Sequence, residues 1–468
     1  MLKPSVVKEL KNIVGPAYLS TLPEDMVAYS YDATQREVLP WAVARPASAE
    51  EVSEILMLAN RDLFPVVPRG AGTGMSGGSV PVHGGLVLSF ERMNRILEID
   101  GENLVAVVEP GVITGDLQRE VEARGLFYPP DPASNQFCTI GGNVAECAGG
   151  LRAVKYGVTK DYVLGLEVVL PTGEIIRTGA RTAKSVAGYD LTKLIVGSEG
   201  TLGVATTIIL RLLPLPESVR TISGFFSTVE SAASAVAKIM AGRIVPRALE
   251  FVDRHALRAV ENYLKEDIAG GAAAMLLVEV DGPADSTERE SGRIAEIMAQ
   301  AGASRVKKAE TDAEREQLWK ARRSISPALY TIKPNKINED IVVPRSRVPD
   351  ILREIEEIAQ RYDLMIVNFG HAGDGNIHTN IMIDEADKPR AESAVEEIFG
   401  SALRMGGSIS GEHGIGLSKA AYLPMEIGPA ALAAMKHIKQ ALDPNNILNP
   451  GKIFMERKEA FKKVSSSS

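Results

Sequence analysis

Three of the six histidines lie in two short glycine-rich motifs, GHAGDGNIH at 370–378 and SISGEHGIG at 408–416. Each motif is predicted to be a loop at the end of a strand, a common mounting point for chemistry. Imidazole and carboxylate groups together suit a divalent metal such as zinc, iron or manganese. His371, His378 and Glu412 would supply two nitrogens and one oxygen and leave positions open for a substrate. His413, beside one of these ligands, is then placed to act as a base.

A purely structural interpretation of these histidines stays open. A loop histidine is commonly a surface residue or a satisfied donor, and this His-x6-His spacing is not a standard zinc signature. The other three histidines lie in no comparable cluster, and we interpret His83, His255 and His437 as structural or surface residues.

A glycine-rich stretch, RGAGTGMSGG at 69–78, contains the pattern G-x-G-x-x-G. In a Rossmann fold that pattern opens a helix. Here Gly77, Gly78, Pro81, Gly84 and Gly85 follow closely, and so many helix breakers predict a loop without a helix. Consecutive backbone N–H groups in such a loop can form an anion-binding nest. A plain set of tight turns is the alternative.

A second stretch, PPDPASNQFCTIGGNVAECAGG at 129–150, combines glycine pairs with small residues and local hydrogen-bonding side chains. Such a segment can run closely along a flat ligand with its backbone polar groups exposed to it. Two such stretches in one chain favour an extended cofactor.

A basic run, LWKARRSISPAL at 318–329, is predicted to begin as a helix. Arg322 and Ser326 are four residues apart and would share a helix face, and Lys336 follows in the next segment. Arginine binds a carboxylate through two parallel hydrogen bonds, so this run is a candidate anchor for an anionic substrate. A solvated charged face is the alternative.

Composition narrows the class of protein. The net charge of -8, from 52 basic and 60 acidic residues, argues against binding to nucleic acid. Two cysteines, Cys138 and Cys147, fit a reducing cytosol. The N-terminus has no apolar signal core, and no apolar run reaches the roughly 18 residues of a spanning helix. We therefore expect a cytoplasmic protein without direct membrane insertion, and docking to a membrane through a partner stays open.

The elements that must position these residues fall into two patterns. Residues 40–217 alternate short β-rich runs with glycine and proline turns, and one helix after Ser48 shows a capping box with Glu51. Beyond the PLPE sequence at 214–217, longer helices alternate with strands. We predict strands at 64–68, 85–90, 104–109, 163–170, 204–213, 274–280 and 365–369, and helices at 229–241, 287–301, 349–362 and 429–442. This rhythm favours an α+β fold.

Together the motifs resemble one family, the FAD-binding subunits of D-lactate and glycolate dehydrogenases. These are flavoproteins of the vanillyl-alcohol-oxidase type, related to D-2-hydroxyglutarate dehydrogenase. The resemblance runs from about residue 29 to 454 and rests on PRGAGTGMSGGSVP, IGGNVAECAGG, VGSEGTLGV at 196–204, GHAGDGNIH, GEHGIG and NPGK. It implies an α+β fold with a two-lobed FAD-binding domain at 1–217. A cap domain with a metal site at 218–420 and a C-terminal segment at 421–468 that returns to the FAD domain complete the expected organisation.

The resemblance also implies roles for individual residues. FAD-binding positions are Arg69, Gly70, Ala71, Gly72, Thr73, Gly74, Ser76 and Gly77 at the pyrophosphate, Pro132, Ser134, Thr139, Gly141, Gly142 and Asn143 along the flavin, and Gly149, Gly150, Gly157, Val204 and Asn449. Relatives with covalent flavin carry a histidine in the first loop, and this loop has none, so noncovalent FAD is expected. The metal ligands match His371, His378 and Glu412, the base matches His413, and the carboxylate-binding residues match Arg322, Ser326 and Lys336.

The implied reaction is the oxidation of a small D-2-hydroxy acid, D-lactate or glycolate, to the 2-oxo acid. His413 takes the hydroxyl proton while the flavin accepts a hydride, and the metal acts as a Lewis acid. Two cysteines cannot hold an iron–sulfur cluster, so we expect an electron-transfer flavoprotein or an iron–sulfur subunit as partner. The formation of a homo-oligomer stays open.

Three alternatives keep the flavin scaffold and change the function. One is a transferase similar to the FAD-dependent ether-lipid synthase, one is D-2-hydroxyglutarate dehydrogenase, and one is a non-catalytic flavin subunit. The last would be expected to have lost the histidine cluster, which is intact here.

Overall fold

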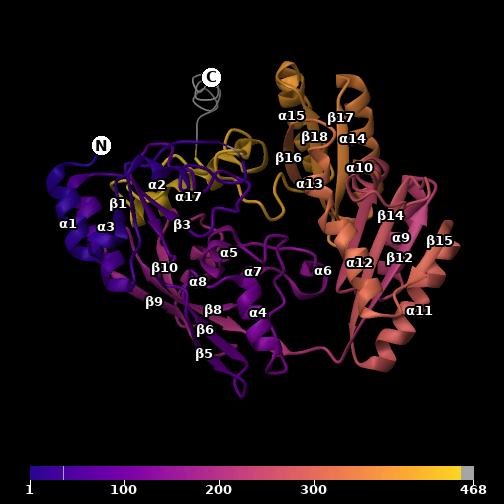
Figure 1. Ribbon diagram of the computed structural model, residues 1–468, viewed down its shortest axis with the longest axis horizontal. Helices are drawn as coiled ribbons and strands as arrows, with labels where there is room; N and C mark the ends of the chain where they lie inside the picture. The colour runs from indigo at the N-terminus through magenta and orange to yellow at the C-terminus, as the bar shows by residue number, and fades with distance from the viewer. Residues whose placement is uncertain (35, 455–468) are drawn as a thin grey trace. The chain divides into compact units, whose positions relative to one another are not determined.

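The structure is a computed structural model that describes residues 1–34 and 36–454 (Figure 1). The chain forms two compact units. Unit 1 comprises Met1–Gly149, Val158–Leu215 and the residues from Glu412 onward, and unit 2 comprises Gly150–Gly157 and Pro216–Gly411. The chain changes unit at 215/216 and 411/412, whereas the sequence places domain boundaries after 217 and 420, and those boundaries stay predictions.

The first sheet of unit 1 has the strand order β1-β2-β4-β3, with β2, β4 and β3 parallel. Its elements are α1 (Pro4–Val14), β1 (Leu19–Ser20), α2 (Pro23–Val27), β2 (Ala42–Ala44), α3 (Ala49–Asp62), β3 (Val66–Arg69) and β4 (Leu86–Ser89). Ser48 caps α3 by accepting a hydrogen bond from the Glu51 amide, as the sequence predicts. The Glu51 carboxylate accepts from the Ala47 amide, one residue earlier than in a standard capping box.

The second sheet of unit 1 is antiparallel and has the order β5-β6-β10-β8-β9. Its strands are β5 (Ile96–Asp100), β6 (Val105–Val108), β8 (Val163–Val169), β9 (Ile175–Gly179) and β10 (Val204–Arg211). Short elements lie between these strands, namely α4 (Thr114–Glu122), β7 (Leu126–Phe127), α5 (Ile140–Glu146), α7 (Thr159–Tyr162) and α8 (Leu191–Ile195), and β11 (Leu213–Pro214) follows β10 and pairs with β7. The strands predicted in this region are confirmed to within a few residues.

Two segments of unit 1 bear on the cofactor loop. Residues 70–85 contain no helix, so the prediction of a loop that differs from a Rossmann turn is confirmed. The C-terminal part, with α16 (Leu423–Glu426) and α17 (Pro429–Leu442), runs back to β3, where the Asn449 amide donates to the Val66 carbonyl. The base of the loop is therefore braced by the end of the chain.

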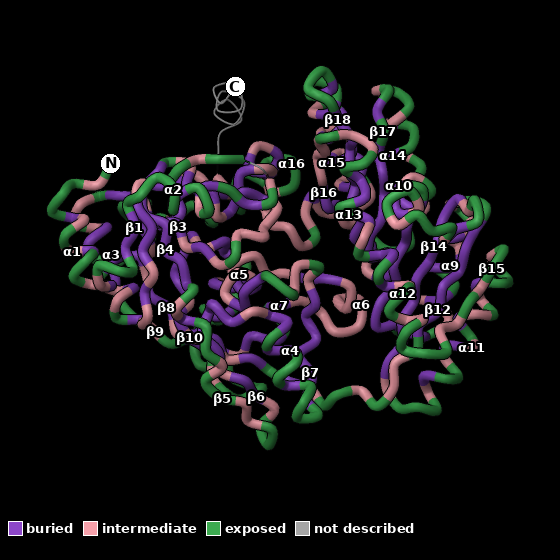
Figure 2. The backbone as a smooth tube through the Cα atoms, viewed as in Figure 1, coloured by how far each residue is buried: buried purple, intermediate pink, exposed green. Residues whose placement is uncertain are grey.

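Unit 2 is built on one antiparallel sheet of seven strands in the order β15-β12-β14-β13-β17-β18-β16. Its strands are β12 (Ser218–Phe226), β13 (Ala248–Asp253), β14 (Ala274–Gly282), β15 (Ala303–Lys308), β16 (Asn335–Val342), β17 (Met365–His371) and β18 (Asn376–Ile383). Its helices are α6 (Ala153–Tyr156), α9 (Val229–Ala241), α10 (Arg254–Leu264), α11 (Ala284–Gln300), α12 (Asp312–Arg323), α13 (Ile325–Leu329), α14 (Val348–Tyr362) and α15 (Lys388–Arg404). The central strands are buried along most of their length (Figure 2).

The short segment with α6 belongs to unit 2 through a polar anchor. The Lys155 ammonium and the Tyr156 hydroxyl both donate to the buried Asp281 carboxylate at the end of β14, at 2.5 and 2.8 Å. Since this anchor joins residues about 125 apart in the chain, no local sequence pattern predicts it.

Two local predictions are wrong. His378 lies within β18, since the turn between β17 and β18 is shorter than the glycines suggest. Arg322 and Ser326 do not share a helix, because α12 ends at Arg323 and α13 begins at Ile325. The sequence makes no prediction of helix in the stretch 129–150, which is partly helical, since α5 forms over a glycine pair where the Thr139 hydroxyl caps it.

Within residues 1–34 and 36–454, every helix is too short or too polar to cross a bilayer.

Candidate active site

Unit 1 contains a cleft beside the glycine-rich loop between β3 and β4, which we call the glycine-loop cleft. Its walls come from that loop, from the segment around α5, from residues 198–205 and from the two residues Glu412 and His413. The site residues predicted from the sequence that line it are Arg69, Gly70, Ala71, Gly72, Thr73, Gly74, Pro132, Ser134, Thr139, Gly141, Gly142, Asn143, Gly149, Val204, Glu412 and His413.

The loop backbone fits a phosphate-bearing cofactor. Among the described residues, no backbone carbonyl accepts a hydrogen bond from the amides of residues 71–74. Gly72 has φ +70°, and a Cβ atom there would overlap the guanidinium of Arg69. Only glycine therefore keeps this loop tight, and its N–H groups are available as an anion nest.

Arg69 braces the loop with its side chain. The guanidinium is almost fully buried and donates to the carbonyls of Tyr31 and Ala28 at 2.7 and 3.2 Å and to the Ser79 hydroxyl at 3.2 Å. Burial lowers the pKa of this guanidinium, and the nearby carboxylate of Asp32 opposes that shift. Because these contacts occupy the Arg69 side chain, we infer that Arg69 lines the cleft with its backbone.

Five predicted FAD residues do not line the glycine-loop cleft in the described part of the chain; they are Ser76, Gly77, Gly150, Gly157 and Asn449. Three of them support it from behind. The Ser76 carbonyl accepts from the amides of Leu417 and Ser418. The Asn449 amide group donates to the carbonyls of Gly78 and Glu199, which line the cleft. Gly77 lies against Leu417, where a Cβ atom would be 2.9 Å from Leu417 Cδ1.

Sequence reasoning missed several cleft residues that come from the motif VGSEGTLGV. Ser198, Glu199, Gly200 and Gly203 line the cleft, although only Val204 of this motif is predicted from the sequence. The signal was the presence of Gly197, Gly200 and Gly203 in this motif, which indicates a tight turn. In the structure Glu199 adopts φ +52° between Ser198 and Gly200.

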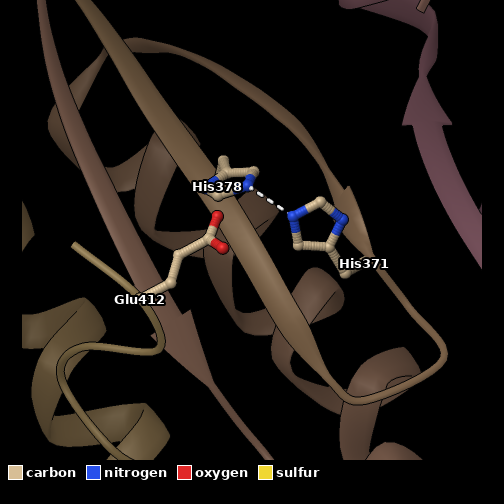
Figure 3. Close-up of side chains that lie close together, drawn as sticks. All are labelled: His371, His378 and Glu412. Atoms are coloured by element: carbon tan, nitrogen blue, oxygen red, sulfur yellow. Dashed lines mark hydrogen bonds between the residues drawn. The ribbon is translucent and has the colours of Figure 1, made fainter. Parts of the chain in front are cut away.

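The two candidate metal-binding histidines lie on neighbouring strands of unit 2. His371 ends β17 and His378 lies on β18 (Figure 3). Their Nε2 atoms are 3.4 Å apart, and both side chains are buried. Two imidazole nitrogens that face each other at this distance fit a shared metal ion or a shared proton.

Glu412 completes a donor set with the two histidines. It is bonded to Gly411, the last residue of unit 2, and one ligand atom from each of His371, His378 and Glu412 lies within 4.8 Å of the others (Figure 3). Two imidazoles and one carboxylate are a donor set that divalent zinc, iron and manganese accept. The residues therefore fit the metal that the sequence predicts.

A buried carboxylate, Glu250 on β13, joins the histidine pair to the predicted anion anchor. Its Oε1 is 2.7 Å from His371 Nδ1, and its Oε2 accepts from Arg322 Nε and Nη2 at 2.8 and 2.6 Å. Burial alone would raise the pKa of Glu250, but His371 and Arg322 outweigh it and hold that pKa below its ordinary value. The hydrogen bond to His371 Nδ1 directs Nε2 of the same ring toward His378.

Sequence reasoning missed Glu250 and also Asn380. A glutamate inside the otherwise apolar strand ALEFVD is a signal that could have identified Glu250. Asn380 follows His378 by two residues on β18 and therefore lies on the same face. It is fully buried, and among the described atoms its Oδ1 accepts no hydrogen bond.

The structure brings Ser326 and Lys336 together, although not through one helix face. The Lys336 ammonium on β16 donates to the Ser326 hydroxyl at 2.8 Å and lies 4.9 Å from the ring centre of Tyr330. Burial lowers the pKa of Lys336 to about 8. Arg322 stacks over Phe369, with its guanidinium carbon 4.8 Å from the ring centre.

Comparison with known proteins identifies the family. Residues 40–179 match the model of the FAD binding domain, and residues 215–453 match that of the C-terminal domain of FAD linked oxidases. The chain belongs to the family of FAD-linked oxidases. This FAD-linked oxidase is 48% identical to the glycolate oxidase subunit GlcD of Bacillus subtilis, over 99% of each chain. It is 38% identical to the D-lactate dehydrogenase of Anaerostipes hadrus, over 90% of this chain and 92% of that one.

Solved structures agree on the fold. P-cresol methylhydroxylase is similar with a TM-score of 0.79 at 17% identity, over 97% of each chain. Alkyldihydroxyacetonephosphate synthase is similar with a TM-score of 0.74 at 19% identity, over 97% of this chain and 85% of that one. The predicted α+β fold of the vanillyl-alcohol-oxidase type is confirmed, and this FAD-linked oxidase is an FAD-dependent oxidoreductase.

Proposed function

We propose that this FAD-linked oxidase oxidises a small 2-hydroxy acid, D-lactate or glycolate, to the 2-oxo acid. The observation that carries the proposal is the arrangement around Glu250, which ties a candidate metal ligand, His371, to a candidate carboxylate anchor, Arg322. A 2-hydroxy acid presents a hydroxyl group and a carboxylate on neighbouring carbons, which is the pair of groups such an arrangement can bind. The names of the two relatives, glycolate oxidase subunit and D-lactate dehydrogenase, support the same substrate class.

FAD is held by the glycine-loop cleft and, when bound, accepts the hydride from the substrate Cα. His371, His378 and Glu412 would hold a divalent metal, which supplies positive charge next to the substrate hydroxyl. Glu250 occupies the Nε and Nη2 edge of the Arg322 guanidinium, so the Nη1 end is the one that binds the substrate carboxylate. Lys336, oriented by Ser326, adds a second positive charge.

His413 is the base in this proposal. It lines the glycine-loop cleft next to Glu412, so its imidazole is mounted beside the cofactor position and directly after a candidate metal ligand. Its role is to take the proton of the substrate hydroxyl as the Cα–H bond breaks.

The electrons must leave the flavin after each turnover. The chain has two cysteines, too few for an iron–sulfur cluster of its own. We therefore place the next carrier on a partner, an iron–sulfur subunit or an electron-transfer flavoprotein, in the cytoplasm or at a membrane to which the partner docks. That the relatives from Bacillus subtilis and Escherichia coli are named subunits supports this view.

Steady-state turnover with an artificial dye acceptor tests the function. D-lactate or glycolate should reduce the dye, whereas a transferase on the same scaffold would act on a lipid phosphate without net dye reduction. Dye reduction by none of the short 2-hydroxy acids would overturn the proposal. The solved synthase shares only the fold at 19% identity and does not favour the transferase.

The affinity for the substrate is expected to weaken above pH 8. The Lys336 ammonium has a pKa lowered to about 8 by burial, so it is charged below that pH and loses its charge as the pH rises through it. KM for the 2-hydroxy acid should rise by up to about tenfold per pH unit beyond pH 8, as the charged fraction falls. The Lys336→Arg variant keeps its charge and should lose this rise. A KM that does not change between pH 7 and 10 in the parent protein would show that Lys336 does not bind the substrate carboxylate.

A further inference from the structure

Glu412, His413 and Gly414 form a span of three residues between two backbone segments, each held by a different buried carboxylate. Asp340 holds the segment before the span, and Glu199 holds the segment after it. The first carboxylate belongs to unit 2 and the second to unit 1. The chain passes from unit 2 to unit 1 at Glu412, within the span.

Asp340 on β16 anchors the backbone up to Gly411. The Gly411 amide donates both to Asp340 Oδ2 and to the Asp340 carbonyl, each at 2.9 Å, and the Ser410 hydroxyl donates to Asp340 Oδ1 at 3.2 Å. Asp340 is fully buried. A Cβ atom at Gly411 would lie 2.5 Å from Asn376 Nδ2, so the backbone is packed closely against unit 2 here.

Glu199 anchors the backbone from Ile415 onward. The amides of Ile415 and Gly416 donate to its two carboxylate oxygens, each at 2.7 Å. Glu199 is itself fixed, since its amide donates to the Ala145 carbonyl and its carbonyl accepts from the Asn449 side chain, both at 2.8 Å. Two short hydrogen bonds from successive backbone amides thus engage both oxygens of one buried carboxyl group, which fixes the backbone at this point.

Steric contact within unit 1 adds to the Glu199 anchor at Gly414. Gly414 has φ +81°, and a Cβ atom there would overlap the Glu146 carboxylate and lie 3.0 Å from Glu199 Oε1. Gly414 is thus constrained by steric contact as well as by the neighbouring Glu199 anchor.

We propose that Asp340 and Glu199 are positioning residues that set the placement of Glu412 and His413 by holding the backbone on either side of them. The inference rests on the proposed function for the roles of Glu412 and His413. Asp340 fixes Gly411, the residue before Glu412, within unit 2, and Glu199 fixes Ile415 and Gly416, which follow Gly414, within unit 1. The cost of a small misplacement of a reacting group is high, about 10²-fold in rate for 1 Å.

The test compares two variants with two matched controls in the full-length, FAD-loaded protein. The variants are Asp340→Asn and Glu199→Gln. The controls are Asp253→Asn in unit 2 and Asp443→Asn in unit 1. Each control replaces a buried carboxylate that accepts two backbone amides, those of Ala256 and Asn368 for Asp253 and those of Ile447 and Leu448 for Asp443.

Hydrogen–deuterium exchange in peptides covering residues 408–417 should accelerate in both variants and stay unchanged in both controls. The kcat for the 2-hydroxy acid should fall by about 10²-fold in the variants. It should stay within threefold of the parent value in the controls. KM should change little in the variants, since Arg322 and Lys336 are intact. A purely structural role would instead lower the FAD-loaded fraction in variants and controls alike and leave kcat per bound FAD unchanged.

Two results would overturn the proposal: exchange at 408–417 that is unchanged in the variants, or a kcat per bound FAD that falls no further in the variants than in the controls. If Glu199→Gln does not fold, Glu199→Asp shortens the side chain instead and should change the exchange rate and kcat in the same direction.

If the parent protein oxidises no 2-hydroxy acid, the proposed function fails. Zn²⁺ affinity, measured by chelator competition, then tests whether Asp340 and Glu199 are positioning residues. The variants should then bind Zn²⁺ at least tenfold more weakly than the controls, and equal affinity would overturn the positioning role.

Discussion

The His413→Gln variant is expected to lose about 10²- to 10⁴-fold in kcat, the usual contribution of a positioned general base. Glutamine approximates the size of the imidazole and can still form hydrogen bonds, but it cannot take a proton at neutral pH. The loop amides of residues 71–74 are unchanged in this variant, so the FAD-loaded fraction should match that of the parent protein.

Rapid-mixing measurement of flavin reduction isolates the step in which His413 acts, because it precedes electron transfer to any acceptor. His437→Gln is the matched control, since His437 is an exposed residue of α17. Its rate of flavin reduction should equal that of the parent protein. An unchanged rate in His413→Gln would eliminate His413 as the base.

The Glu250→Gln variant is expected to damage metal binding and substrate binding together. Glutamine is neutral and has one acceptor oxygen in place of two, so Arg322 loses its buried counter-ion and the side chain can no longer accept from both Arg322 and His371. Loss of a hydrogen-bonding partner behind a metal ligand typically weakens metal affinity by about 10- to 100-fold. Breaking a buried ion pair by removing one partner typically destabilises a protein by about 3–5 kcal/mol.

Glu279→Gln separates these two effects. Glu279 on β14 is also buried and pairs with an arginine, since Arg247 Nε lies 3.2 Å from its Oε1, and it accepts from Trp319 Nε1 at 2.8 Å. It contacts neither histidine in any interaction that the described residues show. Both variants should lower the Tm, but only Glu250→Gln should lower Zn²⁺ affinity and raise KM. Equal Zn²⁺ affinity in the two variants would show that Glu250 only stabilises the fold, through its ion pair with Arg322.

Local patterns in the sequence predicted the parts of the site that local chemistry determines. The helix-breaking residues Gly84 and Gly85 argued against a helix after the glycine-rich loop, and the structure confirms that residues 70–85 contain no helix. The capping residue Ser48 marked the start of α3 correctly. Both predictions depend on the conformations of a few neighbouring residues, which their types largely fix.

Contacts between distant strands could not be predicted in the same way. Glu250 meets Arg322 on α12 and His371 on β17 across 72 and 121 residues of chain, and the pairing of β13 with β17 places Glu250 opposite His371. The direction of the Arg69 side chain, which packs against Gly72 and donates to the Tyr31 carbonyl, depends in the same way on a segment 38 residues earlier. Helix breaks were also missed, because Ser324 between α12 and α13 is no strong breaker by type.

Anaerobic mixing of the FAD-loaded protein with D-lactate, L-lactate or glycolate tests the central claim most directly, since it needs neither a partner nor a dye. The visible flavin absorption should bleach with D-lactate or glycolate, more slowly after treatment with a chelator, and at the original rate once Zn²⁺ or Mn²⁺ is restored. A protein whose flavin is bleached by a chemical reductant but by no 2-hydroxy acid, with or without added metal, would contradict the assignment.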